Sequence, residues 1–213
     1  MEQQMTTQGT GRLTFSLSSM GIDARSRLWA GIRYFTGGEA QWLPAYEEVA
    51  RWLAGNDGRG LLCVGTCGLG KSLICERVLP VLFQFHLKKE VMAVTATDMN
   101  RRIDELLAYC APGRVIIIDD LGTEPAETVT YGNRRRPFCE LADTAERTGT
   151  MLVITTNLRT TMLRLKQDCR LGRAGERDPR GIGSIEERYG VPTLDRLRAT
   201  TRVAVFTGES LRK

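Results

Sequence analysis

Hydrophobic residues form five short runs in this chain, and longer segments with apolar residues at helical spacing lie between them. We predict strands at 61–65, 91–95, 115–119, 151–155 and 202–207, and helices near 71–84, 98–109, 136–148 and 185–198. The continuous apolar runs at 115–118 and 151–154 are typical of strands buried on both faces of a parallel sheet. The alternation therefore predicts right-handed βαβ units in a three-layer α/β fold with a five-stranded parallel sheet.

The first 57 residues do not follow this alternation. Residues 1–17 are polar, with scattered glycines and threonines, and we expect them to be flexible. Apolar positions at helical spacing over 18–55 predict two helices, separated by Gly37 and Gly38. We therefore divide the chain into a short N-terminal helical extension at 1–57 and an α/β domain at 58–213.

Length and cysteine usage narrow the class of protein. The 213 residues suffice for one α/β domain with a short appendage. Six cysteines without a CxxC pair and a single histidine make a structural zinc site unexpected, and free thiols are the simpler interpretation. The N-terminus lacks a secretory pattern, and no apolar run approaches the roughly 20 residues that span a bilayer. We expect a cytoplasmic protein without membrane contact.

Basic residues are concentrated in two places. The net charge of +5 permits contact with a polyanion without arguing for one. Residues 159–183 contain seven basic and three acidic residues with several glycines, which predicts a basic insertion in the α/β domain. A second group is Arg134, Arg135 and Arg136. Both groups suit contact with a polyanion, and both are also compatible with an ordinary solvated surface.

The segment after the first predicted strand matches the pattern GxxxxGK[ST]. Its residues are Gly65, Thr66, Cys67, Gly68, Leu69, Gly70, Lys71 and Ser72. A strand before the pattern and a helix after it form the context in which such a loop binds phosphate through backbone N–H groups. Lys71 is predicted to reach the β- and γ-phosphates, and the Ser72 hydroxyl to bind Mg²⁺. A chance glycine turn is the alternative, but the context favours an ATP·Mg²⁺ site.

An acidic pair follows the third predicted strand. We expect Asp119 to hold Mg²⁺ and Asp120 to orient and deprotonate the attacking water. Glu124 is nearby and competes for the role of base. The alternative is that the strand simply ends in solvated acids, which four preceding β-branched residues make the weaker interpretation.

Three further polar residues complete the predicted site. Asn157 follows the fourth strand, where its amide can position water between the acid pair and the γ-phosphate. Arg188 and Arg196 precede the last strand and are candidate arginine fingers that reach the γ-phosphate bound by a neighbouring subunit. Asn157 could instead simply form a turn after the strand. Either arginine could instead lie on a helix surface and form salt bridges there.

The ordered motifs also resemble those of a known family. GTCGLGKS, VIIIDDLG, ITTN, ERYG and the terminal FTGESLR together resemble the DnaC/IstB-like branch of AAA+ ATPases, over about residues 40–213. The resemblance implies a P-loop NTPase of AAA+ type with strand order 5-1-4-3-2. It also implies Asn157 as sensor and Arg188 or Arg196 as the finger that acts in trans. The sequence stops after the last predicted strand, so we expect no C-terminal lid domain, which many AAA+ proteins have.

Three functions compete on this basis. The first is an ATP-hydrolysing protein of DNA replication or mobile elements; the resemblance implies ATP-dependent homo-oligomerisation, and single-stranded DNA and a replicative helicase or transposase as partners. The second is a small-molecule kinase, whose lid the basic insertion would imitate. The third is a binding module that nucleotide switches without appreciable turnover. The acid pair and Asn157 favour the first.

Overall fold

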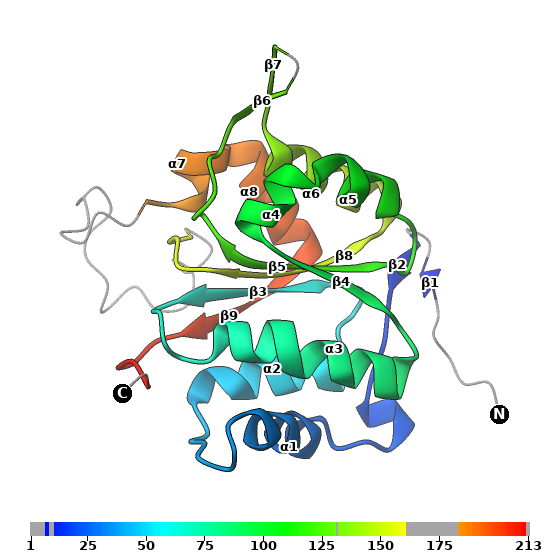
Figure 1. The fold of residues 1–213 in the computed structure, drawn as a ribbon. Helices are drawn as coiled ribbons and strands as arrows, with labels where there is room; N and C mark the ends of the chain where they lie inside the picture. Colours follow the sequence, from blue (N-terminus) through cyan, green and yellow to red (C-terminus); the bar gives the residue numbers. More distant parts are fainter. Residues whose placement is uncertain (1–6, 9–10, 131, 161–182, 212–213) are drawn as a thin grey trace.

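A five-stranded parallel sheet forms the centre of the protein in the computed structural model, which describes residues 7–8, 11–130, 132–160 and 183–211 (Figure 1). Its strands are β3 (Gly60–Gly65), β4 (Val91–Thr95), β5 (Val115–Leu121), β8 (Met151–Thr156) and β9 (Thr201–Phe206). The neighbours in the sheet run β4-β5-β8-β3-β9, all parallel. Numbered within this sheet and read from β9, the order is 5-1-4-3-2. Each predicted strand is present, with ends within two residues of those expected.

Helices cover both faces of this sheet (Figure 1). One face carries α1 (Ala24–Phe35), α2 (Pro44–Ala54) and a helix with π-helical ends, made of η2 (Leu73–Val78), α3 (Leu79–Leu82) and η3 (Phe83–Leu87). The other face carries α4 (Ala96–Arg101), α5 (Ile103–Tyr109), α6 (Pro137–Thr148), α7 (Ile185–Tyr189) and α8 (Val191–Thr200). The predicted three-layer α/β arrangement is confirmed.

The strands separate two hydrophobic cores. Along β3, Leu61 and Cys63 face the core shared with α1 and α2, whereas Leu62 and Val64 face the core on the other side. This alternation follows from the two-residue period of a strand. All four side chains are buried, which confirms that the apolar runs belong to strands covered on both faces.

The segment before α1 is packed rather than loose over residues 11–17, so the expectation of a flexible segment is wrong there. Leu13, Phe15 and Leu17 are 4%, 2% and 1% exposed. The ring of Phe15 meets Trp52 edge-on at 5.3 Å, and its backbone N–H donates to Asn56 Oδ1 at 2.8 Å. Apolar residues at every second position carry this packing, a short strand-like pattern that the polar composition obscured. Residues 1–6 and 9–10 lie outside the described part.

The extension and the sheet share one core, since α1, α2 and residues 13–17 pack in the same cluster as β3 and β9. The first residues also include two short paired strands, β1 (Thr7–Gln8) and β2 (Arg12–Leu13), and a 3₁₀ turn, η1 (Ser18–Met20). The boundary at residue 57 therefore does not separate two hydrophobic cores.

The predicted basic insertion at 159–183 falls almost wholly outside the described residues. Its two ends are described, and they pair with each other. Arg159 donates its N–H to the Gly183 carbonyl at 3.1 Å, and Ile185 donates to the Arg159 carbonyl at 2.9 Å. The segment therefore leaves and re-enters the fold at one place, between β8 and α7.

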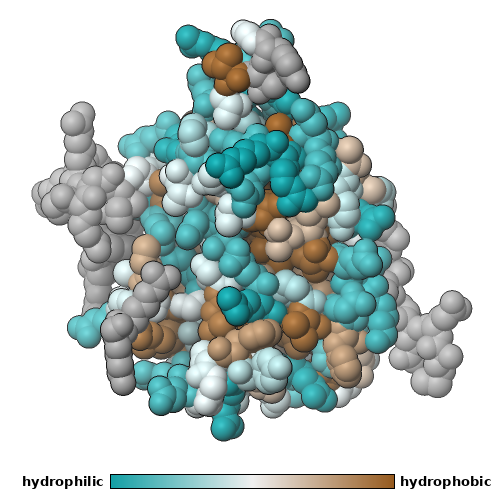
Figure 2. Space-filling view, viewed as in Figure 1, coloured by the Kyte–Doolittle hydropathy of each residue, from teal (hydrophilic) through white to brown (hydrophobic). Residues whose placement is uncertain are grey.

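A hairpin that the sequence did not predict follows β5. Its strands are β6 (Thr128–Thr130) and β7 (Asn133–Arg135), and it projects from the top of the molecule in Figure 1. Val129 is 71% exposed on it, and Figure 2 shows a hydrophobic group at this projection. Arg135 is held by Asp104 at 2.7 Å and by Glu140 at 2.6 Å. Only part of the predicted basic group around it is therefore available to another molecule.

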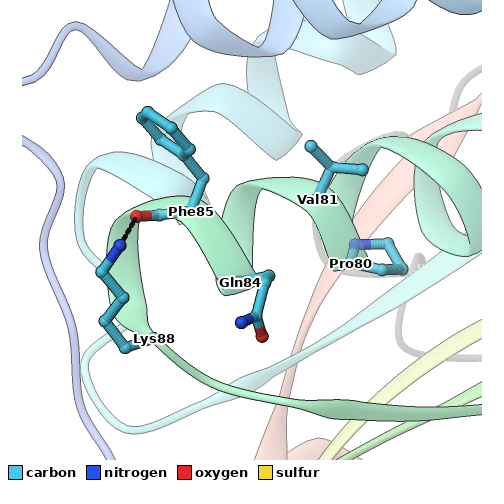
Figure 3. A pocket seen from close by; sticks show the side chains of 5 residues that line it. All are labelled: Pro80, Val81, Gln84, Phe85 and Lys88. Atoms are coloured by element: carbon cyan, nitrogen blue, oxygen red, sulfur yellow. Dashed lines mark hydrogen bonds between the residues drawn. The ribbon is translucent and has the colours of Figure 1, made fainter.

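A surface hollow of 480 Å³ lies along the outer side of the helix formed by α3 and η3. It is lined by Pro80, Val81, Gln84, Phe85 and Lys88. Figure 3 shows these side chains and the hydrogen bond from Lys88 Nζ to the Phe85 carbonyl, 3.0 Å long. Its lining contains no acid, and its one amine, that of Lys88, donates to a backbone carbonyl, so we place the candidate chemistry elsewhere. No helix among the described residues is long and apolar enough to cross a membrane.

Candidate active site

The glycine-rich loop leaves the carboxyl end of β3 and enters the helix that begins with η2. Gly65 has a φ of +128°, and Gly68 and Gly70 have φ values of +80° and +82°. A Cβ at Gly65 would lie only 2.0 Å from the carbonyl oxygen of Phe206 on β9. Only glycine combines such angles with so close an approach. The backbone path of the loop therefore explains the glycines of the motif.

The ammonium group of Lys71 donates hydrogen bonds to three neutral oxygen atoms. Its Nζ donates to the carbonyls of Gly65 at 2.9 Å and Thr66 at 2.7 Å, and to Oδ1 of Asn157 at 2.9 Å. The residue is 4% exposed, and burial lowers the pKa of Lys71 against the opposing effect of nearby cysteines and carboxyl groups. A cation desolvated in this way gains most from an incoming anion such as a phosphate.

The acid pair lies where β5 loses its regular register, between Ile118 and Leu121. Asp120 has a φ of +54°, a left-handed conformation that costs a non-glycine residue about 1 kcal/mol or more. Thr155 Oγ1 accepts the Asp120 N–H at 2.9 Å and donates to Oδ1 of the buried Asp119. The hydroxyl of one β8 residue therefore contacts the carboxylate of Asp119 and the backbone of Asp120.

Strand β8 lies between β3 and β5 in the sheet, and this position brings the predicted residues together. Asn157 follows β8 and contacts Lys71 directly, while Thr155 on the same strand contacts Asp119. Carboxyl ends of neighbouring parallel strands share one edge of a sheet, so the three motifs meet although 86 residues separate Lys71 from Asn157.

Glu76 is a third carboxyl group near this edge, and the sequence analysis did not identify it. Burial raises the pKa of Glu76, and the charges of Asp119 and Asp120 raise it further. Its position, four residues after Ser72 on the following helix, was the available signal.

The Mg²⁺ ligands expected from the sequence fit these surroundings. Within the described ranges, no group of three or more His, Cys, Asp or Glu side chains is arranged to hold a metal ion. Mg²⁺ at a nucleotide is usually held by one or two protein oxygens, phosphate oxygens and water. Ser72 lies directly before η2, where its side chain makes no capping hydrogen bond, and Asp119 lies near the end of β5, so this hydroxyl and this carboxylate match that requirement.

The charges of Asp119 and Asp120 near Glu76 predict that Glu76→Gln stabilises the protein in a pH-dependent way. Because the folded-state pKa of Glu76 lies above its unfolded value, its ionisation opposes folding at high pH, and this cost vanishes as pH falls through the folded-state pKa. The variant should melt about 1–2 °C higher than wild type near pH 8 and gain less near pH 5. Thermal melts at both pH values test this, with the exposed Glu90→Gln as control; a gain that is larger at the lower pH would contradict it.

A hollow of 490 Å³ adjoins the acid pair and receives Asn157 and Arg188. Its other lining residues are Leu121, Gly122, Thr123, Leu158, Gly183, Ser184 and Glu187. Arg188 donates to the backbone carbonyl of Glu124, and its guanidinium lies 5.7 Å from the centre of the Tyr189 ring. The structure therefore places one of the two candidate fingers beside the predicted sensor.

The carboxylate of Glu124 is buried and already accepts hydrogen bonds from within the fold. The residue is 1% exposed, and its carboxylate accepts the Gly122 N–H at 2.8 Å and the hydroxyl of Tyr189. Burial, followed by the hydrogen bond to Glu124, raises the pKa of Tyr189, which keeps that hydroxyl a donor. Of the two acids that compete as base, Asp120 therefore has the more suitable surroundings.

Arg196 is not brought to the glycine-rich loop. Its guanidinium pairs with Asp143 at 2.9 Å and with Glu146 at 3.4 Å, both on α6. These contacts join α8 to α6 within one chain. They correspond to the salt-bridged helix surface that the sequence left open.

The sequence did not predict two of the hydrogen bonds that the glycine-rich loop accepts. The hydroxyl of Tyr46, on α2, donates to the Leu69 carbonyl at 3.1 Å. The backbone N–H of Leu211, after β9, donates to the Gly68 carbonyl at 3.0 Å. Tyr46 reads in the sequence as one apolar position of an amphipathic helix, so only the tertiary structure reveals these partners.

The parallel sheet, the glycine-rich loop after β3 and the acids at the end of β5 together give an α/β fold that is consistent with a P-loop NTPase. Among solved structures, a crystal structure of the DnaC helicase loader is similar to this chain, with a TM-score of 0.52 and 15% sequence identity. The match covers 85% of this chain and 99% of that one. The resemblance seen in the motifs is thus confirmed for the fold. No protein-family model and no curated protein matches the sequence.

Proposed function

We propose that this protein binds ATP with Mg²⁺ and hydrolyses it, as an AAA+ ATPase of DNA replication or mobile elements. The observation that carries the proposal is the contact of the buried Lys71 with Asn157, 2.9 Å long. A lysine, a polar amide and two acids at one sheet edge are groups that phosphoryl transfer to water uses.

Each residue has a distinct task in this proposal. Lys71 exchanges the carbonyls of Gly65 and Thr66 for the β- and γ-phosphates, and loop N–H groups bind the remaining phosphate oxygens. Ser72 and Asp119 hold Mg²⁺, which neutralises charge on the phosphates when it is bound. Asp120 orients the attacking water and takes its proton, and Asn157 fixes the position of that water.

Of the two arginines, we propose that Arg188 serves as the finger. Its guanidinium contacts a backbone carbonyl, that of Glu124, which a phosphate could replace, whereas Arg196 is occupied by two carboxylates of its own chain. Arg188→Ala should lower turnover in the assembled protein by about 100-fold or more, as loss of a finger does elsewhere. Arg196→Ala should mainly cost stability, about 0.5–1 kcal/mol for a partly exposed ion pair.

Mixed assemblies test whether the finger acts in trans. Subunits with Lys71→Ala retain the finger but cannot bind ATP, and subunits with Arg188→Ala retain the nucleotide site. Mixing the two should restore phosphate release that neither shows alone. A mixture that stays inactive, although it assembles, would argue against action between subunits.

The proposed partners are single-stranded DNA, a replicative helicase or transposase, and further copies of this chain. Support comes from the likeness of fold to a helicase loader and from Arg134, which is exposed on the β6–β7 hairpin. Arg135 is excluded from this role because Asp104 and Glu140 hold it.

Phosphate release with and without single-stranded DNA tests the proposal, with sizing in ATP and Lys71→Ala as control. We expect turnover that DNA stimulates, assembly in ATP, and DNA binding that weakens with salt.

Arg134→Ala should weaken DNA binding, with Arg135→Ala as a comparison that affects stability instead. Turnover that depends on Lys71 but ignores DNA would keep the ATPase and reject DNA as partner. Transfer of phosphate to a small acceptor instead of water would identify a kinase.

A further inference from the structure

Two consecutive carbonyls of the glycine-rich loop are held from outside the loop. The Gly68 carbonyl accepts the N–H of Leu211 at 3.0 Å, and the Leu69 carbonyl accepts the hydroxyl of Tyr46 at 3.1 Å. The donors come from opposite ends of the chain, one from α2 and one from the segment after β9. Neither donor belongs to the motif that predicts the loop.

Holding a carbonyl also directs the amide beside it. In a trans peptide the C=O and the following N–H point in opposite directions within one rigid plane. The structure contains no cis peptide bond among its described residues. Fixing the carbonyls of Gly68 and Leu69 therefore orients the N–H groups of Leu69 and Gly70 away from the two donors. Successive N–H groups presented in this way form a concavity that binds anions.

Packing supports both contacts independently of the hydrogen bonds. A Cβ at Gly68 would lie 2.0 Å from Oγ of Ser210, and one at Gly70 would lie 2.6 Å from the Tyr46 hydroxyl. The chain after β9 and the Tyr46 side chain therefore occupy the space directly behind the loop.

Tyr46 is itself held firmly. It is 2% exposed, and its ring lies 5.7 Å from that of Trp42 and 6.1 Å from that of Phe206. Burial raises the pKa of Tyr46, so its hydroxyl keeps the proton that it donates to the loop. A rigid, protonated donor can hold one orientation of the Leu69–Gly70 peptide before any ligand arrives.

We infer that Tyr46 and the segment 208–211 are positioning residues that preset the loop amides of Leu69 and Gly70 for the phosphates of a nucleotide. This inference rests on the proposed function, since it assigns these contacts to the same nucleotide site. It gives the backbone N–H of Leu211 a supporting role behind the loop, and the Leu211 side chain has no part in that role.

Two substitutions remove the donors, and Leu211→Pro also restricts the backbone at positions 210 and 211. Tyr46→Phe deletes the hydroxyl and keeps the ring, and Leu211→Pro deletes the N–H. Leu211→Ala is the matched control, because it alters the side chain and keeps the N–H. Calorimetric titration measures the affinity for ATP·Mg²⁺ and for pyrophosphate, and displacement measures the affinity for adenosine.

Each donor deletion should weaken ATP and pyrophosphate binding by about 3–10-fold, the effect of one net hydrogen bond. Adenosine binding and the melting temperature should stay close to wild type, and Leu211→Ala should bind like wild type. Because the two contacts hold different peptide units, the double variant should show the product of the single effects.

Other results would overturn the inference. Equal weakening of adenosine and pyrophosphate would mark a general structural role, and equal effects of Leu211→Ala and Leu211→Pro would exclude the N–H. Unchanged pyrophosphate binding in both donor deletions, with Lys71→Ala still abolishing it, would reject the inference and leave the proposed function intact. A wild-type chain that binds neither ATP nor pyrophosphate would reject both.

Discussion

A Lys71→Ala variant is expected to lose about 100-fold or more in affinity for ATP·Mg²⁺ and to show no turnover. Removing one partner of a desolvated, charge-assisted contact costs about 2–5 kcal/mol, and every 1.4 kcal/mol is a factor of ten. Lys71 is 4% exposed, so its interaction with phosphate would be screened little by water. Calorimetric titration with ATP·Mg²⁺ measures the loss.

Folding is the necessary control for this variant. Burial lowers the pKa of Lys71, so removing the ammonium relieves a desolvation cost while leaving the carbonyls of Gly65 and Thr66 without their donor. These effects oppose each other, and the melting temperature should change little. Lys88→Ala, at an exposed position after the same helix, should bind ATP like wild type. Undiminished ATP affinity in Lys71→Ala would contradict the assignment of the loop as the phosphate site.

An Asp120→Asn variant is expected to bind ATP within about threefold of wild type and to lose about 100–1,000-fold in turnover, the usual contribution of a general base. Asparagine tolerates the left-handed conformation of this position, where φ is +54°, so the backbone should keep its path. The N–H of residue 120 still donates to Thr155 Oγ1 in the variant. Single-turnover phosphate release and a binding titration separate the two effects.

Glu124→Gln is the comparison that decides between the two acids. The Glu124 carboxylate is buried and accepts from Gly122 and Tyr189, so its replacement should cost about 1–3 kcal/mol of stability. Turnover per folded molecule should fall far less than in Asp120→Asn. The reverse pattern would make Glu124 the base. A wild-type protein that releases no more phosphate than Lys71→Ala would indicate a nucleotide-dependent switch without turnover.

Much of the fold could be predicted because its determinants are local. Strand burial appears in runs such as 115–118, whose side chains the structure shows buried in both cores. The glycines of the loop are required by backbone angles and by the close approach of Phe206, and such constraints leave a spacing that can be recognised without a structure. Residues 11–17 were misjudged because five alternating residues are too few to stand out from a polar segment.

The candidate site was predicted less completely, because sequence position does not reveal which distant side chain a residue meets. Arg188 and Arg196 are equivalent in the sequence, yet one lines the hollow with Asn157 and the other pairs with α6. Likewise the sequence does not reveal that the Glu124 carboxylate accepts from Gly122 and Tyr189, whereas the Asp120 N–H donates to Thr155.

The sequence by itself determined the order of strands and helices, the glycine-rich loop, and the acids and amide that follow the strands. Each of these depends on hydrophobic period, backbone angles or the chemistry of neighbouring residues. Only the tertiary structure decided which residues meet at the carboxyl edge of the sheet. It placed Asn157 against Lys71, Glu76 near the acid pair, and Tyr46 and Leu211 behind the loop. These contacts join segments far apart in the chain, and they form because parallel strands bring their carboxyl ends to one edge.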